Sequence, residues 1–290
     1  MRIPVAPDVS LVADAYGDPS DPPVVLLHGG GQTRHSWDNS ARSLGDAGWY
    51  ALTVDLRGHG DSDWSPDGDY SMDRFAEDVR ALATWLPARP ALVGASLGGM
   101  ASLLAVGESD EEIATGLVLV DIAPRVEMAG VARIRQFMRS GLQGFPDLES
   151  AADAIAAYNP HRPRPKDLSG LKKNLRQKED GRWYWHWDPR FMGLADEDPG
   201  LDGMPSRRMA NPERLEDAAR RLRLPTLIVR GGSSDLLSEE GVQAMLELVP
   251  HAKHVDVAGA GHMVAGDRND RFNAAVVEFL ERDVRPLLRR

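Results

Sequence analysis

The chain of 290 residues contains no cysteine. Disulfides, thiolate nucleophiles and cysteine-ligated metals are therefore excluded, and covalent catalysis has to use another side chain. Long apolar runs are also missing. No stretch of about 18 apolar residues occurs, and Pro4 and Asp8 interrupt the N-terminus where a signal peptide needs an unbroken apolar core. We expect a cytoplasmic protein without a membrane partner.

Basic residues are outnumbered, with 34 Lys and Arg against 44 Asp and Glu and a net charge of -10. Nucleic-acid binding depends on basic patches that neutralise phosphates, so this balance argues against a nucleic-acid partner. The hydrophobic content of 42% is ordinary for globular proteins, which disfavours a disordered or fibrous chain.

Short, continuous apolar runs recur along the chain, with helical patterns between them. They lie at 24–29, 51–55, 91–96, 116–121, 226–231 and 254–259. Continuous apolarity is typical of strands covered on both faces, and the alternation predicts a mostly parallel sheet between two helical layers. Residues 9–16 add an antiparallel edge strand.

One gap breaks this order, because about a hundred residues separate the run at 116–121 from the run at 226–231. This distance is too long for an ordinary connection, and the segment has helical patterns of its own. We therefore predict a core made of residues 1–123 and 222–290, with a helical cap at 124–221 inserted into it.

Ser96 lies in the stretch VGASLGG, where a predicted strand meets a helix. Glycines two residues to either side permit the sharp turn that presents a serine hydroxyl as a nucleophile. A serine needs a base, and we assign this role to His262, which follows the last predicted strand. Asp235 is the first choice for the acid that orients His262, and Asp121 is its rival, because both follow strands.

An oxyanion formed by serine attack needs preorganised donors. We expect them to be the backbone N–H groups of Leu97, directly after the nucleophile, and of Gly30, in the glycine run HGGG at 28–31. The histidines near the C-terminus have no convincing metal-ligand spacing, so no metal site is predicted.

Together, LHGGG at 27–31, DLRGHGDS at 55–62, GASLGG at 94–99, GGSSD at 231–235 and GAGH at 259–262 resemble the α/β-hydrolase superfamily. The resemblance implies an eight-stranded, mostly parallel sheet, a cap after the sixth strand, and a Ser, Asp and His triad without a cofactor. Relatives that use an aspartate nucleophile, such as epoxide hydrolases, are disfavoured because Ser96 occupies that position.

The leading hypothesis is a carboxylic ester hydrolase that acts on small to medium neutral esters, as a monomer or homodimer. Lactonase, carbon–carbon bond hydrolase and cofactor-free perhydrolase activities remain alternatives, as does a non-catalytic small-molecule receptor on the same fold. Four side chains are candidates for contact with the substrate: Trp37, Met100, Trp185 and Trp187. Trp185 and Trp187 either cover the site or form a small core within the cap.

Overall fold

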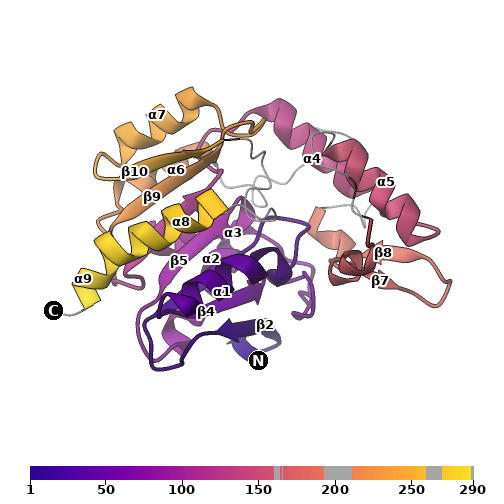
Figure 1. Cartoon of the computed structure of the whole chain (residues 1–290), viewed down its shortest axis with the longest axis horizontal. Helices are drawn as coiled ribbons and strands as arrows, with labels where there is room; N and C mark the ends of the chain where they lie inside the picture. The colour runs from indigo at the N-terminus through magenta and orange to yellow at the C-terminus, as the bar shows by residue number, and fades with distance from the viewer. Residues whose placement is uncertain (160–163, 165, 193–210, 259–269, 289–290) are drawn as a thin grey trace.

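A computed structural model describes residues 1–159, 164, 166–192, 211–258 and 270–288. An eight-stranded sheet forms its centre (Figure 1). In sheet order the strands are β1 (Arg2–Ala6), β2 (Val9–Tyr16), β4 (Tyr50–Asp55), β3 (Pro23–Leu27), β5 (Ala91–Ala95), β6 (Gly116–Val120), β9 (Thr226–Gly231) and β10 (Lys253–Val257). The strands from β4 to β10 are parallel, and β2 is antiparallel to both of its neighbours. The predicted α/β architecture is confirmed.

The sequence pattern missed the outermost strand, β1, so β2 is not the edge strand that we expected. β1 is five residues long and contains Pro4, near which the pairing with β2 is irregular. Proline is tolerated there because an outermost strand has one side without a ladder. The short length and the proline explain why the pattern is weak.

Helices cover both faces of the sheet. They are α1 (Asp38–Asp46), α2 (Met72–Trp85), α3 (Leu97–Gly107), α6 (Pro212–Arg220), α7 (Glu239–Leu248), α8 (Asp270–Phe279) and α9 (Arg285–Leu288), with a π-helix at Leu280–Val284. Side chains of α1 and α8 share one buried cluster with alternate strand residues such as Val24 and Leu26. Those of α2, α3, α6 and α7 share the other with Val25 and Leu27. Each central strand therefore buries both faces, as its continuous apolarity predicts.

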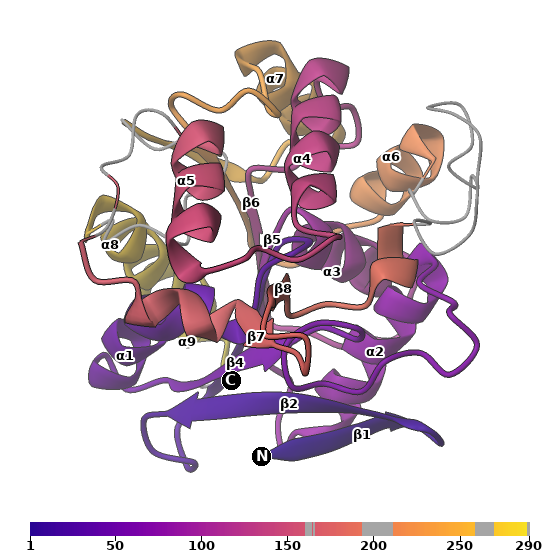
Figure 2. The ribbon, with the colours of Figure 1, turned by 90° about the vertical axis from the view of Figure 1, so that its right-hand side faces the viewer.

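The cap lies across the carboxyl ends of the central strands (Figure 2). Its described elements are α4 (Met128–Ser140), α5 (Leu148–Tyr158), the antiparallel pair β7 (Leu175–Gln177) and β8 (Trp183–Trp185), and the 3-10 helices η2 (Ser169–Lys173) and η3 (Pro189–Met192). The sequence predicted a helical cap, but the cap also contains the two-stranded sheet of β7 and β8.

The predicted C-terminal boundary of the cap, residue 221, lies too far toward the C-terminus, because it includes α6 in the cap. Leu215 and Ala218 of α6 are buried in the same cluster as the sheet residues. The backbone of Ala218 also lies so close to Gly107 of α3 that a Cβ there would clash with it. The apolar stripe of α6 therefore covers the sheet, and this helix belongs to the core.

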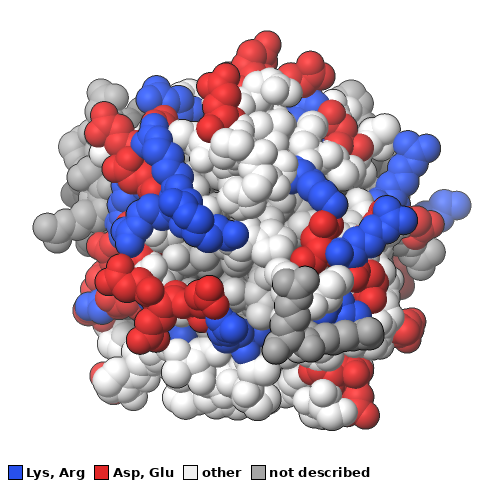
Figure 3. All heavy atoms as spheres, turned by 90° about the vertical axis from the view of Figure 1, so that its left-hand side faces the viewer, with Lys and Arg blue, Asp and Glu red and all other residues white. Residues whose placement is uncertain are grey.

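Charges of both signs lie side by side on the face formed by β10, α8 and α9 (Figure 3). Lys253 pairs with Asp283 at 2.7 Å, and Arg230 pairs with Asp256 at 2.9 Å. Among the described residues, no helix is both long and apolar enough to cross a membrane.

Candidate active site

Ser96 occupies a strained turn between β5 and α3. Its φ of 45° lies in the left-handed region, which non-glycine residues adopt only at an energetic cost of about 1–3 kcal/mol. A Cβ on Gly94 would lie 2.5 Å from the carbonyl oxygen of Gly98, and a Cβ on Gly98 would lie 2.5 Å from that of Leu27. The glycines on either side of Ser96 are therefore required by close backbone packing, and Ser96 itself is partly exposed.

Asp121 lies beside Ser96 at the end of the neighbouring strand. β5 and β6 pair through Ala95 and Val120, and the Ser96 N–H donates to the Val120 carbonyl at 3.1 Å. The φ of Asp121 is 52°, and within the described part of the chain Ser96 and Asp121 are the two non-glycine residues with positive φ. Strained residues of this kind concentrate at functional sites, and here they are adjacent.

The turn between β9 and α7 holds the carboxylate of Asp121, which is fully buried. The Gly231 N–H donates to Oδ1 at 3.2 Å, and the Ser234 hydroxyl donates to Oδ2 at 2.6 Å. Asp121 is thus fixed by backbone strain and by donors from the adjacent strand.

Asp235, the first choice from the sequence, has different surroundings. Its side chain is 38% exposed, and its Oδ2 pairs with the guanidinium of Arg133, on cap helix α4, at 2.8 Å. The carboxylate is therefore engaged by the cap, and the geometry favours Asp121 as the acid.

His262 lies outside the described residues. The last described strand before it, β10, ends beside the turn that holds Asp121, since the Gly232 N–H donates to the carbonyl of Val257, the last residue of β10, at 2.9 Å. β10 therefore lies next to β9, the strand that leads into this turn.

The glycine run after β3 lies against Ser96. A Cβ on Gly29 would lie 3.3 Å from the Cβ of Ser96. The Gly29 N–H donates to Gln32 Oε1, and the Gly31 N–H donates to His59 Nε2, both at 3.1 Å. The N–H groups of Gly30 and Leu97 have no acceptor in the described structure. These two groups are the predicted oxyanion donors, and they are available to a ligand.

Two buried histidines hold this glycine run in place. Backbone N–H groups donate to Nε2 of His28 (from Leu56, 3.0 Å) and of His59 (from Gly31, 3.1 Å). The Nδ1–H groups must therefore donate, to the carbonyl oxygens of Gly29 and Arg57. Burial lowers the pKa of His28 to about 4 and that of His59 to about 3, so both imidazoles stay neutral. His59 thus ties the loop that follows β4 to the glycine run that follows β3.

The lowered histidine pKa values predict a loss of stability in mild acid. The unfolded chain binds protons as the pH falls below about 6.5, whereas the folded chain resists protonation down to a pH of about 4 for His28 and about 3 for His59. The free energy of unfolding should therefore fall between pH 6.5 and 4, by up to about 1.4 kcal/mol per pH unit for each histidine. Urea unfolding of His59→Gln should show a shallower pH slope than the wild type. Parallel slopes would contradict the assignment.

Residues 22–268 match the family model described as the alpha/beta hydrolase fold. The chain belongs to the α/β hydrolase fold family. It is 30% identical to the esterase Rv0045c of Mycobacterium tuberculosis, over 86% of this chain and 79% of that protein. It is also 30% identical to the mouse sn-1-specific diacylglycerol lipase ABHD11, over 91% of this chain and 82% of that protein. These relatives support a hydrolase activity of the esterase kind.

Solved structures agree with this assignment of the fold. The crystal structure of E-2-(acetamidomethylene)succinate hydrolase superposes with a TM-score of 0.81 and 24% identity, over 97% of this chain and 98% of that one. A structure of Rv0045c superposes with a TM-score of 0.73 and 29% identity, over 97% and 91%. The likeness to the succinate derivative hydrolase shows the fold alone.

Two cap side chains of this α/β hydrolase cover the glycine run, and sequence reasoning missed both as site residues. The ring of Phe191, on η3, lies 3.4 Å from where a Cβ on Gly30 would be. The methyl group of Met138, on α4, lies 3.0 Å from the corresponding position at Gly31. An apolar cover of this kind limits the access of water to the predicted oxyanion donors.

The four predicted substrate contacts differ in their surroundings. Trp37 is fully buried and packs against Phe272 at a ring distance of 5.8 Å, in the core beneath α1 and α8. Its large apolar surface fills the core, so its prediction as a substrate contact is wrong. Met100 is partly buried on the first turn of α3, next to the α2 and α3 core cluster. Its position is compatible with either role.

The tryptophans of the aromatic run separate. Trp185 packs edge-to-face against Phe145, at 5.3 Å, and belongs to the small apolar cluster of the cap itself. Trp187 is only 3% exposed, and its backbone forms an isolated antiparallel β-bridge with that of His59. Its ring packs against that of Phe191, with 6.5 Å between the ring centroids. Trp185 therefore has the core role, and Trp187 supports the phenylalanine that covers Gly30.

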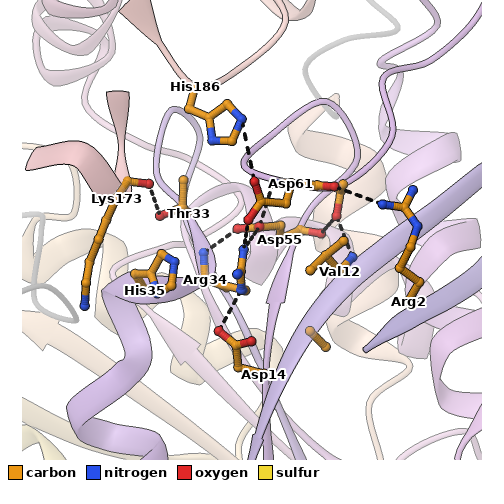
Figure 4. Close-up of polar contacts among 12 residues, drawn as sticks. Arg2, Val12, Asp14, Thr33, Arg34, His35, Asp55, Asp61, Lys173 and His186 are labelled. Carbon is orange, nitrogen blue, oxygen red and sulfur yellow. Dashed lines mark hydrogen bonds and ion pairs between the residues drawn. The ribbon is translucent and has the colours of Figure 1, made fainter. Parts of the chain in front are cut away.

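Polar contacts fasten the β7–β8 side of the cap to the core (Figure 4). The Thr33 hydroxyl donates to Asn174 Oδ1 at 2.9 Å, and the Arg176 guanidinium pairs with Asp61 at 3.1 Å. Asp61 also pairs with Arg34, whose guanidinium contacts the fully buried Asp55. This network fixes the loops that follow β3 and β4. Among the described residues, no three His, Asp or Glu side chains come together as a metal site requires.

Proposed function

We propose that this α/β hydrolase is a serine-dependent carboxylic ester hydrolase, with Ser96 as nucleophile, His262 as base and Asp121 as the acid that orients His262. The observation that carries the proposal is the pair of adjacent strained residues, Ser96 and Asp121, at the ends of β5 and β6. The two N–H groups without acceptors, on Gly30 and Leu97, add support for acyl transfer.

In the first half of the proposed reaction, Ser96 Oγ attacks the carbonyl carbon of the ester while His262 takes the hydroxyl proton. The negative charge moves to the carbonyl oxygen, where the N–H groups of Gly30 and Leu97 stabilise it, each worth about 3–4 kcal/mol. The carbon–oxygen bond to the alcohol then breaks, and His262 returns its proton to the departing alkoxide. An acyl group remains on Ser96.

In the second half, water replaces the alcohol. The oxygen of a water molecule attacks the acyl carbon while His262 takes a proton from that water. The N–H groups of Gly30 and Leu97 stabilise the second oxyanion. Collapse releases the carboxylic acid and returns the proton to Ser96 Oγ. Every proton is carried by a side chain or by substrate, so these steps require no cofactor.

We propose small to medium neutral esters as substrates. The cover over the donors consists of the apolar side chains of Phe191 and Met138, which suit an uncharged acyl or alcohol group. Arg133, one of three arginines on the same cap helix, is engaged with Asp235. The relatives named as an esterase and a diacylglycerol lipase also support an ester substrate.

A fluorophosphonate probe tests the proposal directly, because it phosphonylates a serine only when a base activates it. We expect labelling of the native protein at Ser96, identified by peptide mass spectrometry, and none in Ser96→Ala. Lactonases and carbon–carbon bond hydrolases would also be labelled, so p-nitrophenyl esters from acetate to laurate should follow. A folded protein that is not labelled would favour the receptor hypothesis.

A further inference from the structure

Ser234 makes three hydrogen bonds that leave its hydroxyl a single orientation. Its oxygen accepts from the backbone N–H groups of Leu236 at 3.1 Å and Leu237 at 3.2 Å. A hydroxyl has two acceptor positions and one proton, and both acceptor positions are used. The proton therefore points along the remaining direction, toward Asp121 Oδ2, at an oxygen–oxygen distance of 2.6 Å.

The same turn supplies a second donor to the same carboxylate. The Gly231 N–H, at the end of β9, donates to Oδ1 of Asp121 at 3.2 Å. One donor on each oxygen defines the plane of the carboxylate as well as its position. Rotation of the Asp121 side chain would break at least one of these bonds, in a fully buried place where an unmade hydrogen bond is costly.

We infer that Ser234 is a positioning residue for the reaction: it sets the orientation of Asp121, through which it acts on the histidine. This inference rests on the proposed function, in which Asp121 orients His262. Ser234 and Asp235 are neighbours in the motif GGSSD, yet they serve different partners, since Asp235 is engaged by Arg133 of the cap. The motif thus contributes a hydroxyl to the site instead of a carboxylate.

Removing the hydroxyl should slow turnover without weakening substrate binding. In Ser234→Ala, Asp121 loses its shorter hydrogen bond and gains freedom to rotate. We expect the loss of this hydrogen bond to the Asp121 carboxylate to lower kcat by about 10- to 100-fold, while KM should change by less than about twofold. Ser234→Thr keeps the hydroxyl and should recover most of the rate. Ser233→Ala, at the exposed neighbouring serine, is the matched control and should be silent.

A double-mutant cycle with Asp121→Asn separates positioning from a general structural role. If Ser234 acts through Asp121, Ser234→Ala should cost about 10- to 100-fold in the wild-type background and less than about threefold in the Asp121→Asn background. All variants are compared by p-nitrophenyl ester kinetics and by thermal unfolding. Should Ser234→Ala fail to fold, Ser234→Cys, with its similar size and weak donor, takes its place, with an intermediate loss expected.

Equal losses in both backgrounds, or an unchanged kcat in Ser234→Ala, would overturn the inference. The proposed function is checked separately by Ser96→Ala in the same assay. If Ser96→Ala retains activity, the serine mechanism itself is wrong. If Ser96→Ala is inactive while the Ser234 cycle is additive, the serine mechanism stands and only the role of Ser234 is lost.

Discussion

Asp121→Asn should lower kcat by about 10⁴-fold, while Asp235→Asn should change it by less than about threefold. An asparagine in place of the orienting acid offers an N–H₂ group, which favours the wrong histidine tautomer and leaves the imidazolium without a negative partner. Asp235→Asn breaks the half-exposed pair with Arg133, and exposed pairs of this kind contribute at most about 1 kcal/mol to stability.

The Asp121→Asn variant should report the replacement of the carboxylate by an amide alone, because the substitution preserves the backbone conformation. Asparagine adopts the left-handed region more readily than most residues, so a φ of 52° costs it no more than it costs aspartate. Its carbonyl oxygen also remains an acceptor for one of the two donors from the β9 turn. The two variants should be compared by p-nitrophenyl ester kinetics after thermal unfolding confirms that both fold. A large loss in Asp235→Asn and none in Asp121→Asn would return the acid to Asp235.

The difficulty in choosing this acid from sequence has a physical cause. Asp121 and Asp235 both follow apolar strands, and each pattern places a carboxylate at the carboxyl edge of the sheet. Their surroundings depend on contacts distant in the chain: Ser234 is 113 residues from Asp121, and Arg133 is 102 residues from Asp235. Local patterns do not record such contacts.

The turn at Ser96 was predictable for the opposite reason. Gly94, Ser96 and Gly98 lie within five residues, and the turn itself imposes their spacing. The central strands were predictable because burial on both faces requires continuous apolarity. In contrast, the covering residues Phe191 and Met138 lie on cap elements whose position over Gly30 and Gly31 depends on tertiary packing.

The tryptophans show the same limit. The sequence left open whether Trp185 covers the site or packs within the cap, and the structure places it in the short strand β8. Which partner its side chain meets is decided by the cap, where Phe145 and Phe137 pack against its ring. Trp37 follows the glycine run closely in sequence, but the 3-10 helix at Arg34–Trp37 directs it into the core.

Ser96→Ala should have the largest effect of all, a loss of at least about 10⁴-fold in kcat, because no other group can form the acyl intermediate. Alanine keeps the Cβ that lies against Gly29, and it bears the same strained φ as serine, so the turn and the two oxyanion donors should stay in place. Any rate that remains measures stabilisation by those donors and by binding alone.

The measurement for Ser96→Ala is the initial rate on p-nitrophenyl esters of increasing chain length, with a matched check of folding. In the wild type the rate should depend on chain length, because Phe191 and Met138 restrict the space over the donors, whereas the residual rate of the variant should be nearly independent of it. With an ester whose acyl-enzyme hydrolyses more slowly than it forms, a burst of p-nitrophenol equal to the enzyme concentration should be present in the wild type and absent in the variant, since the burst reports the acyl-enzyme. Hydrolysis that persists in Ser96→Ala at the wild-type rate would exclude Ser96 as the nucleophile, and the strain at its backbone would then need another cause.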